Sequence, residues 1–192
     1  MESSDKDIFK MHGAKGPDSK KEKVARLCWE FFYFLTFTLL PDRGLNLLRI
    51  FILKCFGAKV GYSNQIPASV KILKPWKLHM ATNSCLSKDC DIYNFDFVIL
   101  KENAIVSKNT HLCTATHNYE KLGLPLESKP IVICENTWVA ADCFLGPGVI
   151  VGEGSIVGAR SVVFKELEAW GVYGGYPAKK IKQRRKPEEV LA

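Results

Sequence analysis

His117 is the residue of this sequence best suited to chemistry. It ends the segment "LCTATH", and the stretch that follows it, "NYEKLGLPLESKP", departs from the pattern of the residues around it. A neutral imidazole has a pKa of about 6.5 and can accept a proton near neutral pH, as a general base must. A loop that interrupts a regular fold usually has a reason, and covering a site is a common one. The sequence therefore predicts an active site at His117, beside a loop at 118–130.

Two further histidines hold the same place in the pattern but adjoin no such loop. His111 precedes Leu112 and His79 precedes Met80. We expect both to be structural. Three histidines can also hold zinc in a tetrahedral site with one open position, so a metal site built from His79, His111 and His117 is an alternative. Their spacing argues against it, and we expect no metal.

The pattern itself is a repeat of six residues. Aliphatic side chains recur at every sixth position, with two slips of two residues and one longer break. The fifteen positions are Val60, Ile66, Ile72, Met80, Leu86, Ile92, Leu100, Val106, Leu112, Ile133, Val139, Leu145, Val151, Val157 and Val163. Helices repeat an apolar face every three to four residues and strands every two, so neither period explains six. A hexapeptide period is typical of a parallel β-helix, in which three hexads close one triangular coil.

The sequence therefore predicts an all-β solenoid at 59–168, flanked by segments of different character. A β-sandwich would need turn signals about every eight to twelve residues, which the hexads do not provide. Residues 1–23 are polar and rich in Lys, and we expect a mobile leader there. Residues 24–58 hold two apolar, aromatic-rich segments that we expect to be helices. Residues 169–192 form a basic tail, in which we expect a short helix from Ala178.

Composition narrows the range of partners. The 192 residues are 47% hydrophobic, enough for one main domain, and the net charge of +7 favours anionic partners. The basic run "KKIKQRRK" has no aromatic residues among its charges, so we expect no nucleic-acid partner. The seven cysteines are scattered without a CxxC pair, and the first residues do not resemble a signal peptide. These features favour a cytoplasmic protein with reduced thiols.

The expected helices leave two interpretations open. Each is shorter than the roughly twenty uninterrupted apolar residues of a membrane-spanning helix, and charged residues interrupt both. Those residues are Arg26, Glu30, Arg49 and Lys54. The helices can cap the open first coil, or one face can rest in a membrane interface. Peripheral contact through residues 24–56, at the inner face of the plasma membrane, is therefore a second expectation beside capping.

Longer stretches carry a family resemblance. The segment "ICENTWVAADCFLGPGVIVGEGSIVGARSVVFKE" with the later "GGYPAKKIK" resembles the left-handed β-helix acyltransferases of the hexapeptide-repeat family, which include maltose and galactoside O-acetyltransferases. With "DIYNFD", "LCTATHN" and the apolar helices added, the chain is most similar to the colanic acid O-acetyltransferase branch. The resemblance implies a left-handed coil, acetyl-CoA as acyl donor, a homotrimer, and a sugar hydroxyl of a surface polysaccharide precursor as acceptor.

The resemblance also implies roles for residues on the acceptor side. His117 matches the catalytic base of the family. Asn94 matches an Asn that hydrogen-bonds the acceptor sugar, and an amide can both donate and accept. Trp138 aligns with an aromatic residue near the meeting point of CoA and acceptor, where it could stack on a sugar or pack between subunits. Glu127, in the loop, is the candidate to orient the imidazole, because a base is normally fixed by a third group.

On the donor side, the resemblance points to backbone and basic groups. Ala141 and Ala159 match positions whose main-chain amides contact the pantetheine arm of CoA. Lys165, Lys179 and Lys182 match basic residues near the nucleotide phosphates. Two residues depart from the family pattern: Phe164 stands where Thr is common and Lys179 where Arg is common, which removes a hydroxyl and a bidentate fork. These departures affect the expected affinity for CoA more than its use.

Three other functions remain open at this level. N-acetylation of an amino sugar is the nearest rival. Zinc carbonic anhydrases share the fold, and they would use the three histidines named above as metal ligands. A non-catalytic solenoid that only binds other proteins is the third.

Overall fold

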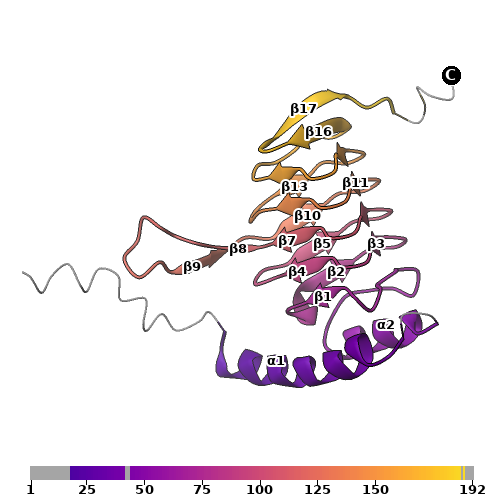
Figure 1. Ribbon diagram of the computed structural model, residues 1–192, viewed down its shortest axis with the longest axis vertical. Helices are drawn as coiled ribbons and strands as arrows, with labels where there is room; N and C mark the ends of the chain where they lie inside the picture. The colour runs from indigo at the N-terminus through magenta and orange to yellow at the C-terminus, as the bar shows by residue number, and fades with distance from the viewer. Residues whose placement is uncertain (1–17, 42–43, 187, 189–192) are drawn as a thin grey trace, which may run out of the picture.

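The computed structural model describes residues 18–41, 44–186 and 188, and it is a β-solenoid of about five turns with helices across its N-terminal end (Figure 1). Three sheets form the walls of the prism, and all their strands pair parallel except β17, which is antiparallel to β16. Sheet A is β2 (Leu78–Met80), β5 (Val98–Leu100), β10 (Ile131–Ile133) and β13 (Ile150–Val151). Sheet B is β3 (Cys85–Leu86), β6 (Ile105–Val106), β11 (Trp138–Val139), β14 (Ile156–Val157), β16 (Gly171–Gly175) and β17 (Ala178–Gln183). Sheet C is β1 (Lys71–Ile72), β4 (Asp91–Tyr93), β7 (His111–Cys113), β12 (Phe144–Leu145) and β15 (Val162–Val163).

The six-residue repeat accounts for the core. All fifteen predicted inward positions are buried, and they stack in register from coil to coil. In sheet C, for example, Ile92 pairs with Leu112, and Leu112 pairs with Leu145. The prediction of a parallel β-helix is therefore confirmed.

The corners between the sheets depend on the left-handed backbone conformation. Asn and Asp supply it at six corners, because their short polar side chains tolerate positive φ. They are Asn83, Asp89, Asn103, Asn109, Asn136 and Asp142. Gly154 has φ +64°, and a Cβ there would lie 2.6 Å from the Trp170 ring. Glycine is therefore required at that corner by contact as well as by conformation.

Two helices and a π-helical turn close the first coil. Helix α1 (Lys20–Tyr33) begins with a capping box, in which the Ser19 and Glu22 side chains each accept the other's backbone N–H. It continues into η1 (Phe34–Thr38), and α2 (Asn46–Cys55) follows. The buried Trp29 donates from Nε1 to the Ile72 carbonyl at 2.7 Å, which ties α1 to sheet C. A short 3-10 helix, η2 (Pro75–Lys77), contacts α2. Of the described residues, no stretch of helix is long and apolar enough to cross a membrane.

The structure differs from the sequence-based expectation in the start of the first helix and in the type of the last element. Helix α1 begins at Lys20 rather than Val24, because the capping box lies within the segment expected to be a mobile leader. Residues 1–17 of that leader lie outside the described residues. The segment from Ala178 to Gln183 is strand β17, antiparallel to β16, and not a helix. It pairs with β16 at the last coil, where an open strand edge would otherwise face solvent. Residues 187 and 189–192 of the expected tail are outside the described residues.

Candidate active site

The predicted loop is a β-hairpin that leaves the solenoid at the corner between sheets C and A. Strands β8 (Ala115–His117) and β9 (Leu126–Ser128) pair antiparallel, with His117 opposite Leu126. Figure 1 shows this hairpin extending sideways from the middle coils. It follows β7 directly, so sheet C fixes the point from which His117 projects.

The His117 ring is oriented by a backbone carbonyl. Its Nδ1 lies 2.6 Å from the Leu124 oxygen, across the turn of the hairpin. A carbonyl only accepts hydrogen bonds, so Nδ1 carries a proton, and in the neutral ring the lone pair is therefore on Nε2. Leu124 has φ +45°, which is an uncommon conformation for a bulky residue. The imidazole is thus held in the tautomer that a base needs, on an exposed strand end.

Glu127, predicted to orient the imidazole, makes its contacts elsewhere in this structure, and Leu124 is the residue that contacts the ring. Glu127 pairs across the hairpin with Thr116, whereas neighbouring residues along a strand point to opposite faces, so Glu127 and His117 face apart. Its Oε1 accepts from Asn118 Nδ2 at 2.7 Å and lies 3.5 Å from Lys121 Nζ. The Asn118 hydrogen bond, more than the nearby Lys121, holds the pKa of Glu127 below its usual value. Glu127 therefore braces the hairpin.

Asn94 was expected to contact the sugar, and the structure contradicts this. The residue is wholly buried. Its Oδ1 accepts the Lys74 N–H at 2.9 Å and its Nδ2 donates to the Lys74 carbonyl at 2.7 Å. Asn64 makes similar bonds at another corner, where its Nδ2 donates to the Ala81 and Ser84 carbonyls. Both side-chain amides join one coil to the next. Because the backbone of Lys74 occupies both the donor and the acceptor of the Asn94 amide, neither is available to a sugar.

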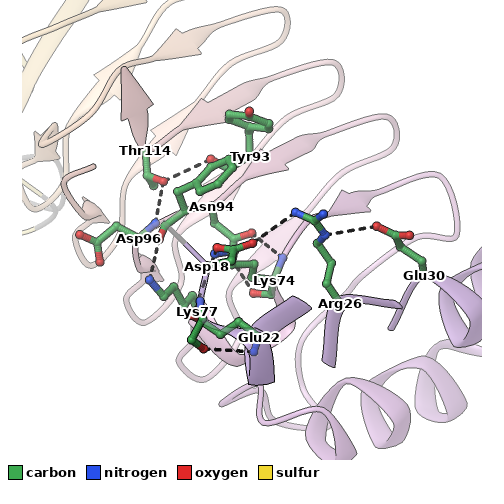
Figure 2. Close-up of polar contacts among 12 residues, drawn as sticks. Asp18, Glu22, Arg26, Glu30, Lys74, Lys77, Tyr93, Asn94, Asp96 and Thr114 are labelled. Atoms are coloured by element: carbon green, nitrogen blue, oxygen red, sulfur yellow. Dashed lines mark hydrogen bonds and ion pairs between the residues drawn. The ribbon is translucent and has the colours of Figure 1, made fainter. Parts of the chain in front are cut away.

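A group of polar residues that the sequence did not single out lies at the same corner as the hairpin (Figure 2). We call Asp18, Arg26, Lys74, Asp96 and Thr114 the corner cluster. The buried Lys74 ammonium pairs with Asp18, and Arg26 Nη1 lies 3.2 Å from the same carboxylate. The Asp96 N–H donates to Thr114 Oγ1 at 2.9 Å. Thr114 lies three residues before His117 in the chain. Asp18 and Lys74 are 56 residues apart, and no local motif marks such a pair.

Trp138 lies on the opposite side of the prism from His117. It projects from sheet B, which faces away from the corner between A and C. The residue is 47% exposed and pairs in register with Ile105 and Ile156 on the neighbouring coils, and its Nε1 donates to Ser107 Oγ at 3.0 Å. One chain therefore does not bring Trp138 and His117 together.

The predicted donor residues also separate into groups. Ala141 and Ala159 stack on successive coils at the corner between sheets B and C, where the Arg160 N–H donates to the Ala141 carbonyl. Lys165 is exposed beyond β15, at the corner that carries the hairpin. Lys179 and Lys182 are exposed on β17. Of these residues, only Lys165 shares a corner with His117 in the same chain.

The other two histidines occupy separate walls. His79 projects from sheet A beside Phe97, where burial and Lys59 lower its pKa. His111 lies on sheet C between the rings of Tyr93 and Phe144. The residues that the structure describes contain no cluster of three His, Cys, Asp or Glu that could hold a metal ion.

Comparisons with known proteins agree with this geometry. The bacterial transferase hexapeptide family (six repeats) matches residues 130–165. The putative colanic acid biosynthesis acetyltransferase WcaF of Escherichia coli K12 is 39% identical over 140 residues, which cover 73% of this chain and 77% of that protein. The chain belongs to the hexapeptide-repeat acetyltransferase family. The predicted family and enzyme class are thereby confirmed.

Solved members of the hexapeptide-repeat acetyltransferases share the whole fold. A maltose O-acetyltransferase from Clostridium difficile 630 has a TM-score of 0.78 and 22% identity, covering 94% of this chain and 98% of its own. The acetyltransferase VCA0836 of Vibrio cholerae, solved in complex with acetyl coenzyme A, has a TM-score of 0.76 and 18% identity, covering 88% and 91%. These likenesses support the solenoid predicted from the repeat and the left hand that the family resemblance implies.

Proposed function

We propose that this acetyltransferase moves the acetyl group of acetyl-CoA to a hydroxyl of a sugar in a bacterial surface polysaccharide precursor. The observation that carries the chemistry is the contact of His117 Nδ1 with the Leu124 carbonyl at 2.6 Å. The substrate class is supported by the likeness to WcaF, named for colanic acid biosynthesis, and by the fold shared with a maltose O-acetyltransferase.

The mechanism is direct transfer within one complex of protein, donor and acceptor. His117 Nε2 takes the hydroxyl proton while the hydroxyl oxygen bonds to the thioester carbonyl carbon. The tetrahedral intermediate then collapses, the carbon–sulfur bond breaks, and the imidazolium returns its proton to the CoA sulfur. The Leu124 carbonyl stabilises the imidazolium between these steps, because its oxygen faces the protonated Nδ1.

Donor binding requires two chains in this proposal. Trp138, Ala141 and Ala159 lie on sheet B or at its corner with sheet C, away from His117. If sheet B of one copy packs beside the hairpin of the next, all of them meet His117 at one interface. Heterologous contacts of this kind close into a ring, and a trimer has three equivalent sites. Small side chains at Ala141 and Ala159 leave the backbone open to the pantetheine arm, and Lys165, Lys179 and Lys182 supply positive charge for the CoA phosphates.

The acceptor side is proposed at the corner cluster. Arg26 and Asp96 retain exposed surface there, and Tyr93 is 38% exposed beside them. A donor, an acceptor and an aromatic ring are the groups that a polyhydroxylated ring requires. This position is next to the base of the hairpin, so an acceptor bound there lies on the side of the prism that carries His117.

The test is CoA release from acetyl-CoA in the presence of sugar acceptors, followed as free thiol. His117→Ala should lower kcat by about 10²- to 10⁴-fold, the usual contribution of a general base. His79→Asn is the matched control, since His79 lies on sheet A away from the hairpin, and it should retain activity. Unchanged transfer by His117→Ala would disprove the assignment. Treating the product with hydroxylamine separates the two acetylation classes, because an O-acetyl ester is cleaved and an N-acetyl amide is not.

A further inference from the structure

The outer surface of the N-terminal helices is apolar although no part of the described chain covers it. We call the exposed apolar side chains of α1, η1 and α2 the basal face; the largest contributors include Val24, Leu27, Phe31, Phe34, Leu47 and Phe51. Leu27 is 65% exposed and Phe31 60%. Soluble proteins rarely expose contiguous apolar patches of this kind unless a partner binds them.

The spacing of these residues shows that α1 and α2 each have two apolar sides, and that the basal face is formed by the sides that do not pack on the solenoid. On α1, Val24, Leu27 and Phe31 recur at three and four residues, while Trp29 and Tyr33 on the other side pack toward the first coil. On α2, Leu47 and Phe51 are exposed while Ile50 and Leu53 are buried. Each helix thus has one apolar side against the solenoid and another facing outward.

The charges at the edge of the basal face favour an anionic partner. Lys20, Lys21 and Lys23 are exposed in the first turn of α1. Cations at a helix N-terminus oppose the helix dipole, so helix stability does not explain them. Glu22 turns toward Lys74, and the exposed Glu30 beside the apolar stripe lies 3.5 Å from Arg26 Nε, so basic side chains outnumber carboxylates at this edge.

We propose that the basal face binds the surface of an anionic phospholipid bilayer. An apolar helix face with lysines at its edge matches the acyl chains and headgroups of such a surface. Neither helix spans the bilayer; both lie in its interface. Figure 1 shows α1 lying across the end of the solenoid, so the prism stands upright on the membrane with the hairpin held away from it.

The symmetry of the proposed trimer strengthens this binding. A cyclic trimer with parallel prisms places three basal faces in one plane, and three linked contacts bind far more tightly than one. This step alone depends on the proposed function, because it uses its trimer. The basal face itself contains no residue assigned to acetyl transfer.

The test is co-sedimentation of the full-length protein with vesicles of phosphatidylcholine alone or mixed with phosphatidylglycerol. The wild type should bind the mixed vesicles and bind less as salt rises. The variant Leu27→Ser/Phe31→Ser should bind at least tenfold less, with unchanged circular dichroism and unchanged transfer to a soluble acceptor. Ile181→Ser is the matched control, because Ile181 is 67% exposed at the opposite end of the solenoid, and it should bind like the wild type.

A second measurement needs no variant. Cys28 is an exposed thiol on α1, next to Leu27, whereas Cys134 lies higher in the solenoid. Mixed vesicles should slow maleimide labelling of Cys28 and leave Cys134 unchanged. Equal labelling with and without vesicles, or equal sedimentation of the Ser variant, would overturn the proposal. So would lipid-free self-association that the Leu27→Ser/Phe31→Ser variant abolishes, since the partner would then be a second copy. Loss of acetyl transfer with vesicle binding intact would instead count against the proposed function.

Discussion

Leu112 and Leu27 are the same residue type in two regions of the molecule. Leu112 lies in the solenoid wall, fully buried and aligned with Ile92 below it and Leu145 above it. Leu27 lies on α1 with 65% of its surface exposed. The solenoid follows its repeat and buries every repeated side chain, whereas the helical base and the hairpin interrupt the repeat and keep their characteristic residues at the surface. In this protein, the inward positions of the repeat supply the core, whereas the hairpin supplies the candidate base and the helices supply the exposed basal face.

The largest effect expected from this comparison concerns the two leucines. Leu112→Ala should lower the free energy of unfolding by about 3–5 kcal/mol, because a closely packed coil cannot collapse into the cavity. Leu27→Ala should change it by less than about 0.5 kcal/mol, as surface substitutions usually do. Urea unfolding of both variants measures the difference. Similar losses in the two variants would show that the base also buries Leu27, which would contradict an exposed basal face.

A second prediction tests whether the base and the solenoid unfold together. The Asp18 carboxylate, just before α1, pairs with Lys74 on the first coil, and both side chains are at least 95% buried. Asp18→Ala leaves a buried ammonium with Glu22 at 4.0 Å and the Phe95 ring at 4.8 Å. The expected loss is about 3 kcal/mol, the low end for breaking a buried pair, because these groups partly compensate.

The matched control for this prediction is an exposed pair in the solenoid. Lys101 Nζ lies 3.5 Å from Glu135, with both side chains more than 40% exposed. Glu135→Ala should cost less than about 1 kcal/mol. Hydrogen exchange of the backbone amides measures the stability of α1 and of the solenoid separately. If Asp18→Ala raised exchange in α1 without lowering the stability of the solenoid, the two regions would unfold independently, which would contradict this prediction.

The sequence reveals the solenoid better than its surroundings for a physical reason. A six-residue period is local and repeated, so positions such as Val139 and Val157 can be assigned without any contact information. The direction of a polar side chain is not local. Asn94 resembles a surface amide in sequence, yet both its Oδ1 and its Nδ2 hydrogen-bond the backbone of Lys74 in the preceding coil. Strand β17 likewise depends on pairing with β16, which a basic run in the sequence does not show.

The candidate site divides in the same way. His117 could be proposed from the sequence because it stands where the repeat stops, and the resemblance implies the same residue. The Leu124 carbonyl could not be found, since it depends on a left-handed backbone in the hairpin turn. Trp138 is separated from His117 because the chain returns from the hairpin into β10 on sheet A and only then reaches β11 on sheet B, the wall opposite the hairpin corner.

The smallest expected effect concerns Glu127. It distinguishes a carboxylate that stabilises the hairpin from one that orients the His117 imidazole. The Asn118 hydrogen bond holds the pKa of Glu127 below its ordinary value, so the stabilisation from this interaction is present above that ordinary value and is lost as pH falls through the lowered one. Asn118→Ala should therefore raise the Glu127 pKa toward its ordinary value, measured by NMR titration of the carboxyl carbon. Glu168 is the internal control. Its pKa is lowered by a hydrogen bond from Lys180 on β17, away from the hairpin, so its titration midpoint should not change in Asn118→Ala.

Activity provides the decisive part of that experiment. Because Leu124 and not Glu127 contacts the imidazole, Glu127→Gln should lower kcat by less than about tenfold, well short of the loss expected for His117→Ala. The hairpin amides should exchange faster in Glu127→Gln, since the carboxylate that accepts from Asn118 is replaced by a neutral amide. A loss of kcat as large as that of His117→Ala would mean that Glu127 holds the base during turnover, and the hairpin would then need to rearrange so that residues on its two faces meet.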